Sequence, residues 1–164
     1  MRIEVEQKYV PITLNKKDSV IQRRNLVQSR KMYKKGIYIN RKPIKSFTSK
    51  KSTHIINAMK MYNVQSIKPS KELSRKTGCS IQGLERIVKK GMGAYYSSGS
   101  RPNQTPLSWG YARLGSSITG NKASVVDNHI LREECIKSSK ALLLSNRARI
   151  NSKTQKNLEK KSRH

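Results

Sequence analysis

The sequence KELSRKTGCSIQGLERIVKKG, residues 71–91, decides the fold. Leu73, Leu84 and Ile87 are apolar at the positions where two short helices would face each other. Gly78 stands between the two helices, at a turn where a positive φ costs glycine little. This spacing predicts a helix-turn-helix-like pair.

The helix pair is expected to occupy residues 70–91. Its second helix is expected to begin after an N-cap at Ser80. A helix offered to a nucleic-acid groove carries polar and basic side chains on its outer face. Two interpretations stay open, because many such pairs bind protein or no ligand, and Gly83 favours close backbone packing over base reading. The outer face would carry Gln82, Glu85, Arg86, Lys89 and Lys90.

Composition indicates a polyanionic partner. The chain has 164 residues, which suffices for one domain with tails, and only 34% of them are hydrophobic, so the core must be small. Thirty-six Lys and Arg against nine Asp and Glu give a net charge of +27. That charge opposes compaction unless an anion neutralises it, so DNA or another polyanion is the expected partner, with capsid or core proteins beside it.

The basic residues are concentrated towards both ends. Residues 16–51 contain thirteen Lys and Arg and one acid, and residues 136–164 contain nine and one. We therefore expect a basic N-terminal arm with one helix (1–51), a helical core domain (52–135) and a basic C-terminal tail (136–164). The tail is expected to be disordered in water and to become ordered along an anion.

Apolar periodicity predicts helices outside the central pair as well. The first runs from Asp18 to Gly36, with Val20 on its apolar face, and residues 1–14 before it are expected to be extended. The fold class is mainly α: a small helical domain of about five helices with extended basic N- and C-terminal arms. The other expected helices are 53–64, 106–119, which Thr105 would cap, and 124–135.

Aromatic residues interleave with the basic N-terminal segment. Tyr33, Tyr38 and Phe47 stand among its Lys and Arg residues. This pattern suits an arm that follows phosphates and stacks on bases, and it suits a solvated linker equally well. Both interpretations stay open.

Other sequence features restrict the cellular setting. Cys79 and Cys135 are far apart, without metal-ligand spacing or a disulfide framework, which indicates two small buried residues in a reducing compartment. The sequence contains neither a run of about 20 apolar residues nor the apolar block of a signal peptide. We expect a protein without a membrane span that is not secreted.

No catalytic constellation stands out. The sequence lacks a P-loop and a Cys–His pair at ligand spacing, and Asp127 and His129 would point about 200° apart on one helix. We expect no enzyme, no cofactor, no metal and no small-molecule ligand. The Gly/Ser/Arg loop at 97–105 could cradle a phosphate through backbone N–H groups, but a turn that positions the Thr105 cap is the favoured interpretation.

Three residues of the second half are assigned structural roles. Arg113 follows Trp109 by four residues, so its guanidinium could stack on the ring. Asp127 is a natural ion-pair partner for Arg113 or Arg101. We favour an ion pair inside the fold over a ligand role.

The segments YYSSGSRPNQT, SWGYARL, SSITGNKAS and VDNHIL, together with TGCSIQGLERIVKK before them, resemble a family of basic proteins. That family occurs in large double-stranded DNA viruses of algae and protists and in phages, and the resemblance spans most of residues 29–145. Asn121 departs from it, since a second glycine is expected after Gly120. The resemblance implies a viral source and a place near genome or capsid, with no reaction to carry over.

The expected function is therefore that of a non-enzymatic virion protein, made in host cytoplasm or viral factory. It would be a minor capsid or core component whose basic arms bridge capsid subunits, the genome or both. The alternatives are a helix-turn-helix regulator that reads DNA sequence and a purely protein–protein capsid bridge. The expected nucleic-acid-binding residues are Lys16, Lys17, Arg23, Arg24, Arg30, Lys31, Lys34, Lys35, Arg41, Lys42, Arg75, Gln82, Arg86, Lys89, Lys90 and Arg101.

Overall fold

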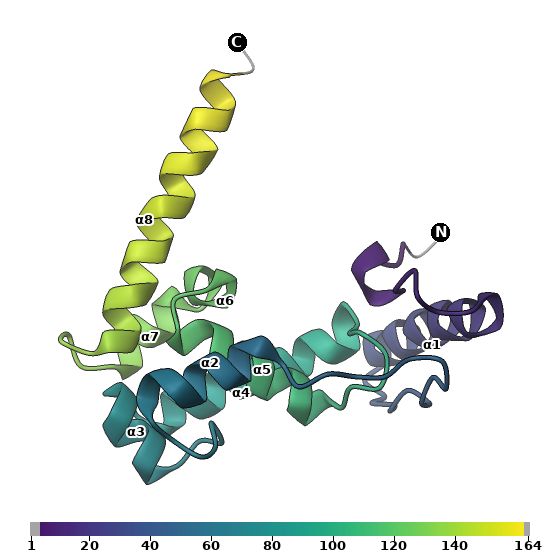
Figure 1. The fold of residues 1–164 in the computed structure, drawn as a ribbon, viewed down its shortest axis with the longest axis horizontal. Coiled ribbons are helices and arrows are strands. Elements are labelled where there is room, and N and C mark those ends of the chain that lie inside the picture. The colour runs from purple at the N-terminus through teal and green to yellow at the C-terminus, as the bar shows by residue number, and fades with distance from the viewer. Residues whose placement is uncertain (1–3, 163–164) are drawn as a thin grey trace. The chain divides into compact units, whose positions relative to one another are not determined.

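A computed structural model describes residues 4–162 of the chain, and within them every regular element is a helix (Figure 1). The predicted mainly α fold is confirmed. Eight α-helices occur in the described part, more than the five expected. After a short 3-10 helix, η1 (Gln7–Tyr9), they are α1 (Lys16–Lys34), α2 (Thr53–Tyr62), α3 (Lys71–Thr77), α4 (Ile81–Ser97), α5 (Pro106–Ile118), α6 (Lys122–Val126), α7 (Asn128–Glu134) and α8 (Lys140–Lys161).

The chain forms two compact units that do not follow the expected division into arm, core and tail. Unit 1 consists of Met1–Lys51 and Lys90–Gly110, and unit 2 of Ser52–Lys89 and Tyr111–His164. The N-terminal segment therefore folds together with the end of α4 and the following loop. It is not an arm appended to a separate core.

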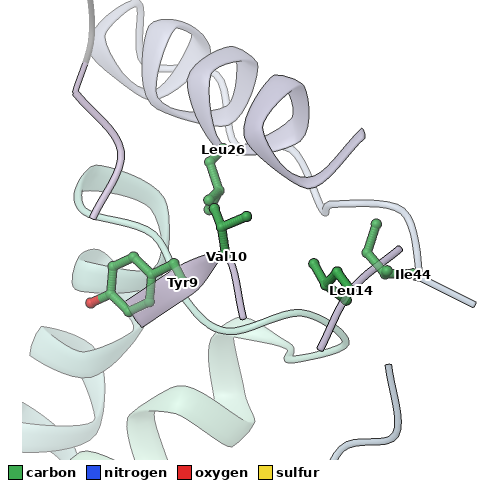
Figure 2. Packing of buried hydrophobic residues seen from close by; sticks show 5 residues of the cluster. All are labelled: Tyr9, Val10, Leu14, Leu26 and Ile44. Atoms are coloured by element: carbon green, nitrogen blue, oxygen red, sulfur yellow. The ribbon is translucent and has the colours of Figure 1, made fainter. Parts of the chain in front are cut away.

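Unit 1 has a small apolar core of its own. Tyr9, Val10, Leu14, Leu26 and Ile44 are all buried, and Figure 2 shows their side chains gathered between α1 and the segments before and after it. The prediction that the N-terminal residues are extended was wrong, because they form η1 and the turns after it. They also supply three of these five buried side chains. Burying them stabilises a folded conformation that charge pattern alone does not indicate.

The buried face of α1 is more polar than its sequence suggested. Asn15, rather than Asp18, is the N-cap, and its side chain accepts a hydrogen bond from the Asp18 N–H at 2.8 Å. Gln22 is buried and donates from Nε2 to the Tyr9 carbonyl oxygen at 3.0 Å, whereas Val20 is exposed. Val20 does not form part of the core, because polar side chains with backbone partners occupy the inner face.

The loop between α4 and α5 holds the N-terminal segment in place. The Asn103 side chain accepts from the Ile44 N–H at 2.7 Å and donates to the carbonyl oxygens of Ile44 at 3.1 Å and Phe47 at 2.8 Å. The predicted cap is confirmed, since Thr105 Oγ1 accepts from the Ser108 N–H at 3.0 Å. The structure thus uses this loop for packing and capping.

In unit 2 the predicted helix pair is confirmed. Ser70 caps α3, Gly78 ends it at a φ of 75°, and Ser80 Oγ accepts from the Gly83 N–H at 3.0 Å at the start of α4. The apolar residues expected at the contact between the helices are fully buried: Leu73, Leu84 and Ile87.

A disulfide joins the turn of this pair to the segment after α7. Cys79 and Cys135 are bonded, and backbone hydrogen bonds flank them from Ser80 N–H to the Glu134 carbonyl (2.7 Å) and from Ile136 N–H to the Gly78 carbonyl (2.9 Å). The prediction of two separate buried thiols was wrong. Since the two cysteines are 56 positions apart in the sequence, no local spacing could indicate the bond.

The C-terminal part of unit 2 is helical to Lys161. The expected helix at 124–135 is interrupted at Asp127, and α6 and α7 on either side both pack on α8. The expectation of a disordered tail was wrong for its described residues. Ser139 Oγ caps α8 by accepting from the Leu142 N–H at 3.2 Å, and Figure 1 shows the later turns of α8 extending past α7. None of the described helices has the length and apolar character that crossing a membrane requires.

The close approach of α5 to α2 gives a testable consequence. A Cβ added at Gly115 would lie 2.7 Å from the backbone oxygen of His54, which cannot move aside as a side chain would. We expect Gly115→Ala to lower the free energy of unfolding by about 1–3 kcal/mol, measured by urea denaturation. Gly93→Ala is the matched control, because nothing lies within 4 Å of its added Cβ. It should be neutral or stabilise by up to about 1 kcal/mol, and equal effects at the two positions would contradict the packing.

Candidate nucleic-acid interface

The exposed cations of unit 1 lie mainly on α1 and the segment after it. Asp18 is the only acid between Glu6 and Glu72, and its carboxylate accepts from the Ser46 N–H at 2.9 Å. Hydrogen bonds from Ser46 lower the pKa of Asp18, so it stays ionised but is directed towards this partner. Most of the predicted binding residues here are exposed: Lys16, Lys17, Arg23, Arg24, Lys31, Lys34, Lys35 and Lys42, with Arg30 half-buried.

Arg41, also a predicted binding residue, has partners inside unit 1, and a role in binding stays a prediction. Its Nη1 donates to Ser29 Oγ at 3.0 Å and to the Tyr95 carbonyl at 2.9 Å, and its Nη2 donates to Ser100 Oγ at 2.7 Å. The guanidinium also lies 3.7 Å from the centroid of the Tyr95 ring. Burial lowers the pKa of Arg41. The residue fastens the segment after α1 to the end of α4.

The first turns of α4 are engaged inside unit 2. Arg86 Nη1 lies 2.8 Å from Glu133 Oε2 and 3.1 Å from Glu134 Oε1, and the bond to Glu133 raises the pKa of Arg86. The Ser80 hydroxyl donates to the Glu134 carboxylate, and a Cβ at Gly83 would overlap Glu134. Two acids therefore engage the guanidinium of Arg86, and a base-reading role for this residue stays a prediction.

The other predicted residues near the helix pair remain on the surface. Gln82 and Lys89 of α4 and Arg75 of α3 are exposed, and Lys90 is half-buried. Arg101 is exposed in the loop of unit 1. These positions are compatible with contacts to an anion.

Asp127 and His129, which were considered for catalysis, both have partners within unit 2. Asp127 is fully buried and accepts two bonds from Arg113, from Nε at 2.9 Å and from Nη2 at 2.8 Å. The Ser117 hydroxyl donates to the same carboxylate at 2.7 Å. His129 is exposed, with Nδ1 3.2 Å from the Val126 carbonyl oxygen. The expected ion pair is thus present, and it links α5 to the junction of α6 and α7.

Trp109 has a different partner from the one expected. Its ring packs edge-on against Tyr9, with centroids 5.9 Å apart, beside the core of unit 1. The prediction that Arg113 stacks on Trp109 was therefore wrong, because the guanidinium of Arg113 is bonded to Asp127. Among residues 4–162 no group of three or more His, Cys, Asp and Glu side chains could hold a metal ion.

A cluster of tyrosines lies where α1 ends. Tyr38 contacts Tyr33 and Tyr96 edge-on, at centroid distances of 5.7 Å and 5.1 Å, and the rings of Tyr33 and Tyr96 are parallel at 6.1 Å. We call Tyr33, Tyr38 and Tyr96 the tyrosine cluster. Sequence reasoning named the first two but not Tyr96, and Phe47, the third aromatic considered, packs on the core instead.

The cations of α8 form a second basic surface that the list of expected residues omitted. Only Glu159 opposes them among the residues after Glu134. The rising charge towards the C-terminus was the signal, but a helix to carry it was not expected. Its exposed members are Lys140, Arg147, Lys153, Lys156, Lys160 and Lys161.

Comparisons with curated proteins and with solved structures give no match for this chain. A protein family, however, matches residues 7–134. This range runs from η1 to the end of α7, so it includes the Arg41 contacts, the helix pair and the Arg113–Asp127 ion pair. The chain belongs to the family of unknown function DUF5824.

Proposed function

We propose that this protein is a non-enzymatic, DNA-binding structural component of the virion of a large double-stranded DNA virus. It would be a minor capsid or core protein whose basic surfaces contact the genome and whose exposed apolar residues contact neighbouring capsid subunits. The observation that carries the DNA contact is the exposed, largely unopposed positive charge on α1 and α8.

On α1 the spacing of the cations creates a continuous surface. Lys17, Arg24 and Lys31 follow one another at intervals of seven residues, which places them on one side of the helix. A stripe of this kind neutralises phosphates along a backbone, and the release of condensed counterions drives such binding. It requires no particular base sequence.

On α8 the same argument applies to the turns that extend beyond the packed residues. Ala141, Leu142 and Ser145 are buried, whereas all the described residues after Ser152 are exposed. Lys153, Lys156 and Lys160 occupy one face at helical spacing. Packing contributes little to the stability of these exposed turns, so phosphate contacts on this face would stabilise them further.

The arrangement disfavours the alternative of a sequence-specific regulator. In a helix-turn-helix protein the N-terminal residues of the second helix contact base edges. Here Glu134 bonds to Ser80 and Arg86 at that end of α4 and packs against Gly83. Binding with little sequence preference is the expectation that fits.

The virion assignment rests on the resemblance to a viral family, and α8 supports the bridging role. Leu143, Ile150 and Leu158 are 56%, 64% and 62% exposed and stand seven and eight residues apart on this helix. Apolar side chains at such intervals form a narrow stripe that a second protein can cover. The same helix would thus offer lysines to DNA and exposed apolar side chains to a neighbouring subunit.

Binding of the full chain to a random-sequence duplex tests the DNA contact. We expect the affinity to fall at least about a thousandfold between 50 mM and 200 mM salt, as for a protein that makes six or more phosphate contacts. Fluorescence anisotropy with a labelled duplex measures it. Weak binding at ~0.15 M salt with a shallow slope would contradict the proposal and favour the protein–protein bridge.

A further inference from the structure

The tyrosine cluster combines solvent exposure with a rigid support. Tyr38 is 66% exposed, although two ring neighbours hold it from the side. Tyr95, next to Tyr96 in the chain, is 1% exposed and packs edge-on against Tyr96 at 5.1 Å. Burial raises the pKa of Tyr96, so this phenol stays neutral under ordinary conditions. The cluster is thus an exposed aromatic surface that a buried tyrosine, Tyr95, supports from below.

The backbone that carries Tyr38 is fastened on both sides. The Ile37 N–H donates to the Met32 carbonyl oxygen at 3.0 Å, which folds the chain back onto the end of α1. Three residues after Tyr38, the Arg41 N–H donates to the Tyr95 hydroxyl at 3.3 Å, and the Arg41 guanidinium bonds to Ser100 as described above. Little conformational entropy remains to be lost when a ligand contacts the ring.

The charge around the cluster selects its ligand. Lys34 and Lys35 directly follow Tyr33, Lys42 follows Arg41, and all three lysines are exposed. No acidic residue occurs anywhere from Ser19 to Lys71. An apolar protein partner would have to bury this positive charge without compensation, whereas a phosphate backbone neutralises it while its bases reach the rings.

Paired and unpaired bases differ in what they offer to a tyrosine. In a duplex the faces of the bases are covered by their neighbours, and only the edges are accessible in the grooves. In a single strand the faces can stack on aromatic side chains, largely independently of sequence. We propose that the tyrosine cluster, with the lysines beside it, is a stacking site for unpaired nucleotides. This inference rests on the proposed function, to which it adds a second form of nucleic acid.

The experiment measures, by fluorescence anisotropy, how tightly the full chain binds three labelled nucleic acids. They are an oligothymidylate of about 16 nucleotides, an abasic strand of the same length and a random duplex. The abasic strand keeps the phosphates and removes the bases. We expect oligothymidylate to bind about tenfold or more tightly than the abasic strand, because each stacked base contributes about that factor.

Substitutions at Tyr38 then assign the difference to the ring. Tyr38→Leu keeps an apolar side chain at an exposed position, so the fold should persist, as circular dichroism would verify. It should weaken oligothymidylate binding by about tenfold and leave abasic-strand and duplex binding unchanged. Tyr38→Trp, which retains an aromatic face, should preserve the preference for bases.

The outcomes separate this inference from the proposed function. Steep salt-dependent duplex binding with equal affinities for oligothymidylate and the abasic strand would overturn the stacking site alone. A preference for oligothymidylate that survives Tyr38→Leu would also overturn it, because another surface would then hold the bases. Weak duplex binding with a Tyr38-dependent preference for oligothymidylate would overturn the duplex contact and support the stacking site.

Discussion

Replacing Asp127 with alanine is expected to lower the free energy of unfolding by about 3–5 kcal/mol. The carboxylate is fully buried and accepts two bonds from Arg113 and one from Ser117. Its removal leaves the guanidinium of Arg113, whose side chain is only 21% exposed, without the charge that compensates its desolvation. Urea denaturation followed by circular dichroism measures the loss.

The chain offers a matched control in an exposed arginine–carboxylate contact. Arg86 and Glu133 also lie 2.8 Å apart, but their side chains are 41% and 58% exposed. Glu133→Ala should therefore leave stability almost unchanged, since solvent screens exposed pairs. A similar loss in both variants would show that burial of Asp127 does not set the strength of the pair.

Reducing the Cys79–Cys135 disulfide is expected to have an effect of comparable size. The bond closes a loop of chain with a sequence separation of 56, and the chain-entropy model gives about 4 kcal/mol for a loop of this length. The midpoint of urea denaturation should fall when a reductant is added. The physical cause is the larger conformational freedom of the unfolded chain without its cross-link.

A variant without thiols controls for other effects of the reductant. The double substitution Cys79→Ser with Cys135→Ser should match the reduced wild type, and the reductant should not change it further. An unchanged midpoint in the reduced wild type would contradict the disulfide as a stabilising element.

The parts of the fold that sequence predicts are those whose signals are local. Gly78 at a positive φ, Ser80 as a cap and Thr105 before Pro106 are each recognisable within a few residues, and all three are confirmed. The apolar spacing in α3 and α4 likewise gave the buried contact correctly. Local backbone chemistry and helical periodicity decide these features.

The features that sequence did not predict depend on contacts between distant residues. Arg41 is indistinguishable from its exposed neighbours in a basic segment until Tyr95 and Ser100 are placed around it. Arg86 is similar, because the acids that bind it lie 47 and 48 positions away. A count of charges predicts a polyanionic partner but cannot separate the cations that support the fold from those available to a ligand.

The same limit explains the N-terminal segment and the C-terminal helix. Tyr9 and Leu14 are buried in a cluster with Leu26 of α1 and with Ile44. The predicted arm contained these residues, but the sequence did not indicate that they pack together. In α8, the buried Ala141, Leu142 and Ser145 determine that a helix starts, and the charged residues simply continue it. High charge therefore did not mean disorder in this part of the chain.

The most direct test of the DNA contact compares two variants of α8 in duplex binding across a salt series. One carries glutamine and the other arginine at Lys153, Lys156, Lys160 and Lys161, all of which are exposed. The two replacements have similar helix propensity, so charge is the main difference between the variants. We expect the arginine variant to keep the wild-type slope of log K against log salt. The glutamine variant should lose about 0.9 from the slope for each phosphate contact removed. Equal slopes in both variants would contradict the proposal that α8 binds DNA.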